Sequence, residues 1–278
     1  MPPFIVVHDL YFSYPNYVTA LQGVNLNIDK GELMAIMGEN GAGKTTLVKH
    51  FNGLLRPQSG SVTVDGIDTR NATVAELSTR VGYVFQNPLY QLFSETVEKE
   101  MMLGLSGVNL PDSEKKNRVD EVLIELGVER FRNRHPLMLS EGERKRVAIA
   151  SVLVMDPAVI ALDEPTLALD YTEKRRLGGV IERLHNEGHT IILVTHDVEF
   201  AFDLSERIVT MSRGKILADL PKEKVFNGEA SLDAAGLVEP QLFQLARRLK
   251  ALDVHISDFS VEGAFAGVMK RVKRSKGK

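Results

Sequence analysis

Gly38-Glu39-Asn40-Gly41-Ala42-Gly43-Lys44-Thr45 is the stretch of sequence that decides the fold. It follows a short apolar run, Leu33–Met37, and precedes a segment, Thr45–Phe51, that is expected to begin a helix. Glycines allow backbone N–H groups to curl around phosphates without Cβ clashes, and a helix N-terminus adds partial positive charge. The order strand, glycine-rich loop, helix therefore predicts a phosphate-binding loop, and makes a chance match in an ordinary glycine turn the weaker interpretation.

The residues of this loop have distinct expected roles. The Lys44 ammonium should contact the β- and γ-phosphates, and the Thr45 hydroxyl should ligate Mg²⁺. The other residues expected around the nucleotide are Asn40, Gly41, Ala42, Gly43 and Thr46. Taken alone, the loop indicates only a nucleotide, because kinases, GTPases and helicases share it.

Strands and helices alternate around this loop in the way that an α/β fold requires. Apolar or alternating runs predict strands, and amphipathic spacing predicts helices between them. The predicted strands are 5–7, 24–28, 33–37, 61–64, 81–85, 159–162, 190–194, 207–211 and 215–217. Helices are predicted over about 88–150, including one from Ser113 to Leu126 and one from Glu141 to Val154, and over about 172–186. A further helix, with Leu242, Leu245, Leu249 and Leu252 on one face, is predicted after Pro221.

Composition excludes several functional classes. The chain has 278 residues with a net charge of −3, so we expect no nucleic-acid partner. It contains no cysteine, which excludes disulfides and thiolate metal sites. The N-terminus has no basic region of the signal-peptide kind, and the longest apolar stretch, 147–162, is interrupted by Asp156-Pro157. We therefore expect a soluble protein whose membrane role, if any, depends on a partner.

A pair of acids, Asp163-Glu164, ends the apolar strand Val159–Leu162. The C-terminal edge of a parallel sheet is where ligands bind in α/β folds. Asp163 should hold Mg²⁺, directly or through water, and Glu164 should accept the proton of the attacking water. A polar loop or a helix cap is the structural alternative, but it does not explain why the pair occurs with a phosphate loop.

The order of motifs along the chain resembles that of the ABC ATPase family over nearly the whole length. Tyr14 precedes the phosphate loop, as the adenine-stacking aromatic does, and Gln86 in Phe85-Gln86-Asn87-Pro88 resembles the Q-loop glutamine. The segments that resemble the signature, the D-loop and the switch histidine are Leu139-Ser140-Glu141-Gly142-Glu143, Leu169-Asp170 and Thr195-His196-Asp197.

This resemblance implies a P-loop NTPase of the RecA-like type. Its expected parts are a mixed sheet core, an antiparallel β subdomain, an inserted helical subdomain over about 88–150 and a small C-terminal extension. The ATPase domain would cover 1–221, and the extension, a possible dimerisation element, would cover 222–278. The ligands implied are ATP and Mg²⁺.

The resemblance also implies site residues and a partner. Glu164, His196, Gln86 and Lys44 would act in hydrolysis, with Gln86 also sensing the metal beside Thr45 and Asp163. Ser140 and Gly142 would bind the γ-phosphate held by the opposite protomer, and Asp170 would belong to the same interface. A complete site would then need a homo- or heterodimer of ATPase subunits, in which ATP joins the two copies.

Two positions depart from the family pattern. Glu141 replaces the first glycine of the signature and Glu143 replaces its glutamine, while Ser140 and Gly142 are retained. Added carboxylates near a triphosphate repel it, and Arg144 and Lys145 are placed to offset this repulsion. Activity is therefore expected to survive.

The run Gln86–Glu100 narrows the resemblance to the energy-coupling factor ATPases, the A-components of cobalt, nickel and vitamin uptake systems. In that group the region couples to integral membrane subunits, which implies a peripheral location at the cytoplasmic face of the membrane. Ala234–Leu249 resembles the C-terminal extension of the same group. The sequence does not identify the transported solute, because the residues that would contact the solute lie on another subunit.

Two other functions compete with import. A soluble ABC ATPase of DNA repair or translation would usually carry two cassettes or a long coiled-coil insertion, and this sequence has one cassette and no heptad insertion. A non-catalytic regulatory subunit would have a degenerate site, whereas Lys44, Asp163, Glu164 and His196 are all present.

Overall fold

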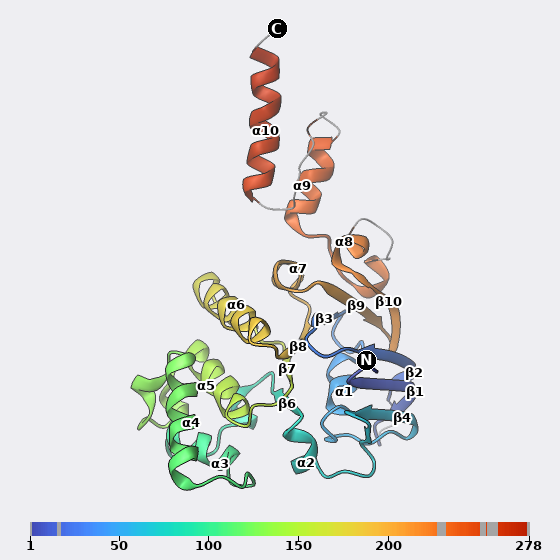
Figure 1. Cartoon of the computed structure of the whole chain (residues 1–278). Coiled ribbons are helices and arrows are strands. Elements are labelled where there is room, and N and C mark those ends of the chain that lie inside the picture. The colour runs from blue at the N-terminus through green and yellow to red at the C-terminus, as the bar shows by residue number, and fades with distance from the viewer. Residues whose placement is uncertain (1, 16–17, 227–231, 251–253, 255–260, 277–278) are drawn as a thin grey trace.

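The computed structural model describes residues 2–15, 18–226, 232–250, 254 and 261–276 (Figure 1). These residues form two sheets, one of four strands and one of six. The larger sheet runs through the middle of the molecule, and helices cover one of its faces while the smaller sheet lies on the other side (Figure 1).

The six-stranded sheet carries the phosphate loop. Its strand order is β10-β9-β3-β8-β7-β6, and all pairs are parallel except β10 with β9. In that order the strands are Lys215–Pro221, Arg207–Ser212, Leu33–Met37, Thr190–Thr195, Val159–Asp163 and Val81–Val84. Strands β3, β8, β7 and β6 are buried along their whole length, which explains why they read as continuous apolar runs in the sequence.

Alternate residues of these strands enter two different cores. Leu33, Ala35 and Met37 of β3 face the helices, whereas Met34 and Ile36 pack on the side of the smaller sheet. The smaller sheet is antiparallel, with the order β2-β1-β4-β5. Its strands are β1 (Ile5–Ser13), β2 (Thr19–Ile28), β4 (Ser59–Val64) and β5 (Ile67–Asp68). Helix α1 (Lys44–Lys49) contributes Leu47 and Val48 to the core between the two sheets.

A helical region is inserted between β6 and β7 and forms the green lobe of Figure 1. Its helices are α3 (Val97–Gly104), α4 (Asp112–Glu125) and α5 (Glu141–Leu153), and short 3₁₀ turns cover Pro88–Tyr90, Glu129–Phe131 and Pro136–Met138. Two further helices, α6 (Tyr171–Asn186) and α7 (Val198–Leu204), pack against the sheet on the same side. A helix that the sequence analysis did not anticipate, α2 (Val74–Ser78), precedes β6 and begins with a capping box at Thr73.

The segment after β10 packs on the core before it leaves the body of the molecule. Short turns at α8 (Lys222–Lys224) and η5 (Asp233–Ala235) are followed by α9 (Gln241–Lys250) and α10 (Val261–Lys276), which project from the body (Figure 1). Phe202 of α7 contacts Phe226 and Phe243 edge to face, with ring centroids 5.4 and 5.2 Å apart. The start of the predicted extension therefore shares the main hydrophobic core, and Leu252 lies outside the described residues.

The α/β class with a mixed sheet, an antiparallel β part and inserted helices, expected from the sequence, is confirmed. The main differences lie at element ends: β2 begins at Thr19, five residues before the predicted Val24, and β1 continues to Ser13. Both strands are longer than the segments predicted from the sequence, because β1 and β2 continue to pair through register shifts beyond Val7. Among the described residues, no helix has both the length and the apolar character needed to cross a bilayer.

Candidate functional site

The glycine-rich loop between β3 and α1 is shaped by close backbone packing. Gly38 has φ 151°, and a Cβ there would lie 2.2 Å from the Met211 carbonyl oxygen. Gly43 has φ 104°, and its Cβ would lie 2.5 Å from the Ala20 carbonyl oxygen. Neither position can accept a larger residue without moving the sheet, so the loop keeps its curled form and its N–H groups remain available for an anion.

This loop forms the floor of a pocket of about 300 Å³. The lining includes nearly all the residues expected around the nucleotide: Tyr14, Asn40, Gly41, Ala42, Gly43, Lys44, Thr45, Thr46, Gln86 and Glu164. Val18, just before β2, and Thr19 and Ala20 at its start complete the wall and were not anticipated from the sequence. The Tyr14 hydroxyl lies 3.2 Å from Thr46 Oγ1, which fixes the aromatic ring at the edge of the pocket.

Lys44 is buried under the loop with its ammonium directed at the loop itself. Its Nζ donates to the carbonyl oxygens of Gly38 (2.7 Å) and Glu39 (3.0 Å) and lies 3.9 Å from Glu164 Oε1. Burial lowers the pKa of Lys44, while the carboxylates of Glu164, Asp163 and Glu39 oppose this shift. The cation is thus held at the pocket floor by groups that a phosphate could replace or supplement.

Thr45 and Asp163 form the oxygen-rich corner of the site. Thr45 Oγ1 lies 2.9 Å from both carboxylate oxygens of Asp163, and the buried Tyr83 hydroxyl donates to Asp163 Oδ2 at 2.6 Å. Burial raises the pKa of Asp163, although hydrogen bonds from Tyr83 and Thr45 counteract it. A hydroxyl and a carboxylate side by side suit Mg²⁺, which is usually bound by one or two carboxylates with water and substrate phosphates.

Tyr83 was not anticipated from the sequence, and we predict that its hydroxyl stabilises the protein. Without it, Thr45 is the one hydrogen-bond partner that Asp163 Oδ2 keeps among the described residues, in a buried position. Tyr83→Phe should lower the free energy of unfolding by about 1–3 kcal/mol, measured by urea denaturation. The control is Tyr14→Phe, whose hydroxyl is only partly buried and should matter less. Equal losses in the two variants would contradict this role for Tyr83.

Glu164 lies opposite Lys44, and its surroundings suit a proton acceptor. His196 Nδ1 is 2.9 Å from Glu164 Oε2, and the Thr195 hydroxyl donates to the same oxygen at 3.3 Å. Glu164 is itself a strained position, with φ 47°. Because β7 and β8 are adjacent and parallel, their C-terminal ends bring the acid and the histidine together.

Ser140, Gly142 and Asp170 do not line this pocket. Ser140 is the N-cap of α5, and Glu143 completes a capping box by accepting from the Ser140 N–H at 3.0 Å. Asp170 is the N-cap of α6, where its carboxylate accepts from the Glu173 N–H at 2.8 Å. Within one chain Ser140 and Asp170 therefore cap helices, and Gly142 lies in the first turn of α5.

Comparison with known proteins decides the family. The family model described as ABC transporter matches residues 21–167, which is more than half of the chain.

The chain belongs to the ABC transporter family.

Relatives of this ABC protein support the same assignment. It is 40% identical, over 90% of each chain, to the energy-coupling factor transporter ATP-binding protein EcfA2 of Clostridium tetani. The solved structure of cbiO1 from Clostridium perfringens, described as part of the ABC transporter complex cbiONQ, superposes with a TM-score of 0.76 at 34% identity, covering 89% of this chain and all of that one. These matches confirm the P-loop NTPase fold and the resemblance to energy-coupling factor ATPases.

A dimeric cassette is also among the similar structures. The bacterial ABC transporter cassette MJ0796, solved as a dimer, matches with a TM-score of 0.70 at 31% identity, over 78% of this chain and 98% of that one. Two other curated relatives, both named putative ABC transporter ATP-binding proteins, are longer, and this chain spans only 42% and 43% of their length.

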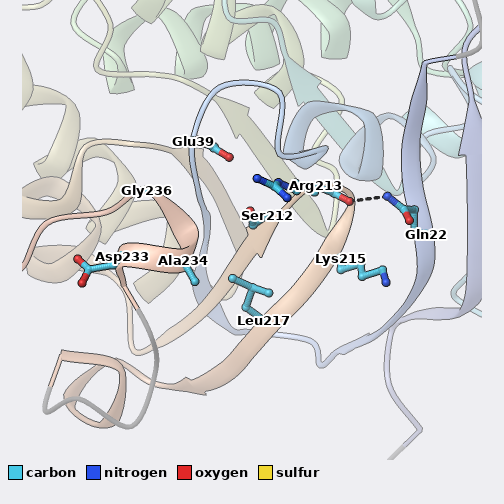
Figure 2. A pocket seen from close by; sticks show the side chains of 9 residues that line it. All are labelled: Gln22, Glu39, Ser212, Arg213, Lys215, Leu217, Asp233, Ala234 and Gly236. Atoms are coloured by element: carbon cyan, nitrogen blue, oxygen red, sulfur yellow. Dashed lines mark hydrogen bonds between the residues drawn. The ribbon is translucent and has the colours of Figure 1, made fainter.

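The ABC cassette has a second, larger hollow of about 620 Å³, with Glu39 of the glycine-rich loop in its lining (Figure 2). It is lined by Gln22, Glu39, Ser212, Arg213, Lys215, Leu217, Asp233, Ala234 and Gly236. Gln22 Nε2 donates to the Arg213 carbonyl oxygen at 2.8 Å (Figure 2), and the Glu39 N–H donates to the Ala235 carbonyl oxygen at 2.9 Å. Despite its size, this hollow includes only Glu39 of the glycine-rich loop, and the Glu39 N–H is already donated to Ala235, so we assign the phosphates to the smaller pocket.

Gln91 lies in the run that resembles the coupling region of energy-coupling factor ATPases, and its hydrogen bonds within the cassette were not predicted from the sequence. Its Oε1 accepts from the Phe85 N–H at 3.0 Å, and its Nε2 donates to the Ala148 carbonyl oxygen at 2.7 Å. The side chain thereby joins the segment around Gln86 to helix α5. Nearby, Tyr90 and Phe93 are 71% and 70% exposed, which leaves two large aromatic side chains on the surface of the helical region.

Proposed function

We propose that this ABC cassette binds and hydrolyses ATP as the energising subunit of an importer of the energy-coupling factor type. The observation that carries the proposal is the division of the motifs. Lys44, Thr45 and Glu164 line one pocket, and Asp163 and His196 contact Thr45 and Glu164 from behind that lining. Ser140 and Gly142 are not in the lining and lie at the start of α5. A site built this way is complete only when a second cassette faces the first.

In the proposed complex the phosphates lie on the loop N–H groups at the start of α1, and Lys44 neutralises their charge. Asn40, Gly41, Ala42, Gly43 and Thr46 surround the phosphates, and Tyr14 stacks on the base. Thr45, Asp163 and Gln86 would hold Mg²⁺, which neutralises charge that develops on the phosphates. Among the described residues, no group of three or more acidic or histidine side chains is arranged to hold a metal ion, so the nucleotide itself would supply the other oxygens.

Glu164 is the proposed general base. Its carboxylate lies between Lys44 and His196, so a water that attacks the terminal phosphate can give its proton to Glu164. His196 then keeps the carboxylate oriented and senses the terminal phosphate. Gln86 reaches the same pocket from the end of β6 and positions the water.

The second cassette is a copy of this chain or a related one. Its Ser140 and Gly142, at the N-terminus of α5, would contact the terminal phosphate bound by the first cassette, because a helix start favours an anion. Asp170 would lie in the same interface. ATP then stabilises the closed pair through mass action, and hydrolysis removes that stabilisation.

The proposed membrane partner docks on the helical region. Tyr90 and Phe93 are exposed aromatic residues a few positions after Gln86, and aromatic residues are enriched at protein interfaces. The cassette would therefore be peripheral, at the cytoplasmic face of the membrane. Relatives named as transporter ATP-binding proteins favour import over DNA repair or translation, and the transported solute is left to the membrane subunits.

The proposal is tested by isolating the chain with its complex from detergent-solubilised membranes. We expect integral membrane subunits to co-purify, and we expect Mg·ATP-dependent phosphate release from the complex. Replacing Tyr90 and Phe93 together by serine should release the membrane subunits without loss of nucleotide binding. A chain that hydrolyses ATP but captures no membrane protein would overturn the transport part, and an inactive complex would overturn the enzymatic part.

The unusual signature acid Glu143 gives a further prediction. Burial opposes its ionisation, yet hydrogen bonds from Ser140 outweigh this, so the pKa of Glu143 lies below its usual value. Glutamine can replace glutamate in a capping box, and it removes a negative charge close to the proposed γ-phosphate site. Glu143→Gln should therefore keep hydrolysis at the wild-type rate or raise it, measured as phosphate release. A collapse of turnover with the fold intact would show that the charge itself is needed.

A further inference from the structure

Lys145 is a buried cation that the family motifs do not explain. It lies in α5, five residues after Ser140, and only 5% of its surface is exposed. Burial lowers its pKa to about 8, against the opposing influence of Glu141 and Glu164. Among the described residues, no carboxylate comes within ion-pair distance of its ammonium. A buried charge without a carboxylate partner needs other compensation.

Backbone carbonyls supply that compensation, and all of them belong to one loop. Lys145 Nζ donates to the carbonyl oxygens of Leu167 (2.5 Å) and Pro165 (3.0 Å), and lies 3.5 Å from that of Glu164. An ammonium has three donors, so this single side chain is fully occupied by the loop that follows β7. The contact therefore joins helix α5 to the segment carrying the proposed general base.

The loop that receives these bonds is strained at both ends. Glu164 has φ 47° and Ala168 has φ 60°, both in the left-handed region that residues with a Cβ adopt at a cost. Such a conformation persists only where the surroundings hold it. The internal bonds of the loop are from the Leu167 N–H to the Glu164 carbonyl oxygen (3.2 Å) and from the Leu169 N–H to the Thr166 carbonyl oxygen (3.1 Å). Among the described residues, Lys145 is the donor to the Pro165 and Leu167 carbonyls, while the Glu164 N–H donates to the Val194 carbonyl oxygen at 2.7 Å.

Helix α5 gives this contact its significance. Ser140 caps the same helix. At a rise of about 1.5 Å per residue, Ser140 and Lys145 are about 7.5 Å apart along the helix axis. In the proposed dimer Ser140 contacts the phosphate held by the second cassette, while Lys145 contacts the loop of its own Glu164. One rigid helix thus connects the neighbouring site to the base of this one.

We propose that Lys145 is a positioning residue that holds the Glu164–Ala168 loop in its strained conformation and ties the proposed general base to the signature helix. This inference rests on the proposed ATPase function. It assigns Lys145 no contact with the nucleotide. Loss of the side chain should therefore slow the chemical step. The affinity of the phosphate loop for ATP should not change.

The test is Lys145→Met in the complex isolated with its membrane subunits, or in the chain if that alone is active. We expect kcat for ATP hydrolysis to fall by about 10- to 100-fold, as is usual when a reacting group is misplaced. The dissociation constant for ATP, measured without turnover, should stay near the wild-type value. Lys145→Gln, which keeps a polar amide in the buried position, serves the same test if the methionine variant does not fold.

The matched control is Lys222→Met. Lys222 Nζ also donates to a backbone carbonyl, that of Phe202 at 2.9 Å, but far from Glu164 in sequence and outside the pocket. This variant should lose stability on thermal denaturation without loss of kcat. If Lys145→Met keeps the wild-type kcat, or loses kcat and ATP affinity in equal proportion, the inference is wrong. Absence of hydrolysis in the wild type would instead overturn the proposed function.

Discussion

Replacing Glu164 with glutamine is expected to reduce ATP hydrolysis by about 100-fold or more while ATP still binds, because the amide cannot accept the proton of the attacking water. Glutamine keeps the shape of the side chain and can still contact His196 Nδ1, now 2.9 Å from the carboxylate. Lys44 lies 3.9 Å from the same carboxylate and remains available for phosphate. The variant should therefore retain nucleotide and not turn it over.

Phosphate release and equilibrium ATP binding measure the two halves of this prediction. The control is Glu187→Gln, which removes the same charge at the exposed C-terminal end of α6. That control should hydrolyse ATP at the wild-type rate. ATP hydrolysis at the wild-type rate by Glu164→Gln would show that Glu164 is not the general base.

The second large effect is expected at Gly142, the signature glycine. A Cβ at this position would lie 2.4 Å from Glu173 Oε2 and 2.7 Å from Glu173 Cδ. Glu173 cannot easily move away, because Arg146 holds Oε2 at 2.7 Å and Arg176 holds Oε1 at 3.0 Å. Gly142→Asp adds both this clash and a negative charge where the proposed γ-phosphate of the second cassette would lie.

We expect Gly142→Asp to reduce hydrolysis by about 100-fold or more, comparable to the loss of a key electrostatic contact in a transition state. ATP binding to the isolated chain should remain, since Gly142 does not line the pocket. Gly107→Asp is the control, because a Cβ there meets nothing within 4 Å. Loss of ATP binding by isolated, folded Gly142→Asp would mean that the signature acts on the nucleotide of its own chain.

The sequence predicts the core of this site because its chemistry is local. The phosphate loop, the Asp163-Glu164 pair and His196 each follow an apolar strand, and parallel strands bring their C-terminal ends together. The continuous apolar run of β3 likewise indicates a strand that is buried on both faces, and its residues alternate between the two cores. Local periodicity and motif chemistry are therefore sufficient for the α/β class, the phosphate loop and the acidic pair, whereas Tyr14, Gln86 and His196 were expected from the resemblance to the ABC ATPase family.

Contacts between distant segments were not predictable in the same way. Tyr83 reads as one more buried strand residue until β6 and β7 pair and its hydroxyl reaches Asp163. From the sequence, Lys145 was expected to offset the repulsion between the signature carboxylates and a triphosphate. In the structure it is buried and donates to the Pro165 and Leu167 carbonyls, a contact that nothing in the sequence shows. Such residues act through hydrogen bonds to groups that are distant in the sequence. The spacing of residues along the chain does not predict these contacts.

The central claim is that a nucleotide is enclosed between two cassettes, and a cross-link between two copies tests it most directly. The sequence has no cysteine, so introduced cysteines react alone. Val18 at the pocket wall and Met138 just before Ser140 are 54% and 79% exposed. In the Glu164→Gln background, Val18→Cys chains mixed with Met138→Cys chains should give a covalent dimer with a short bifunctional maleimide when Mg·ATP is present, and little with ADP. A yield of cross-linked dimer that does not change with nucleotide would contradict the account.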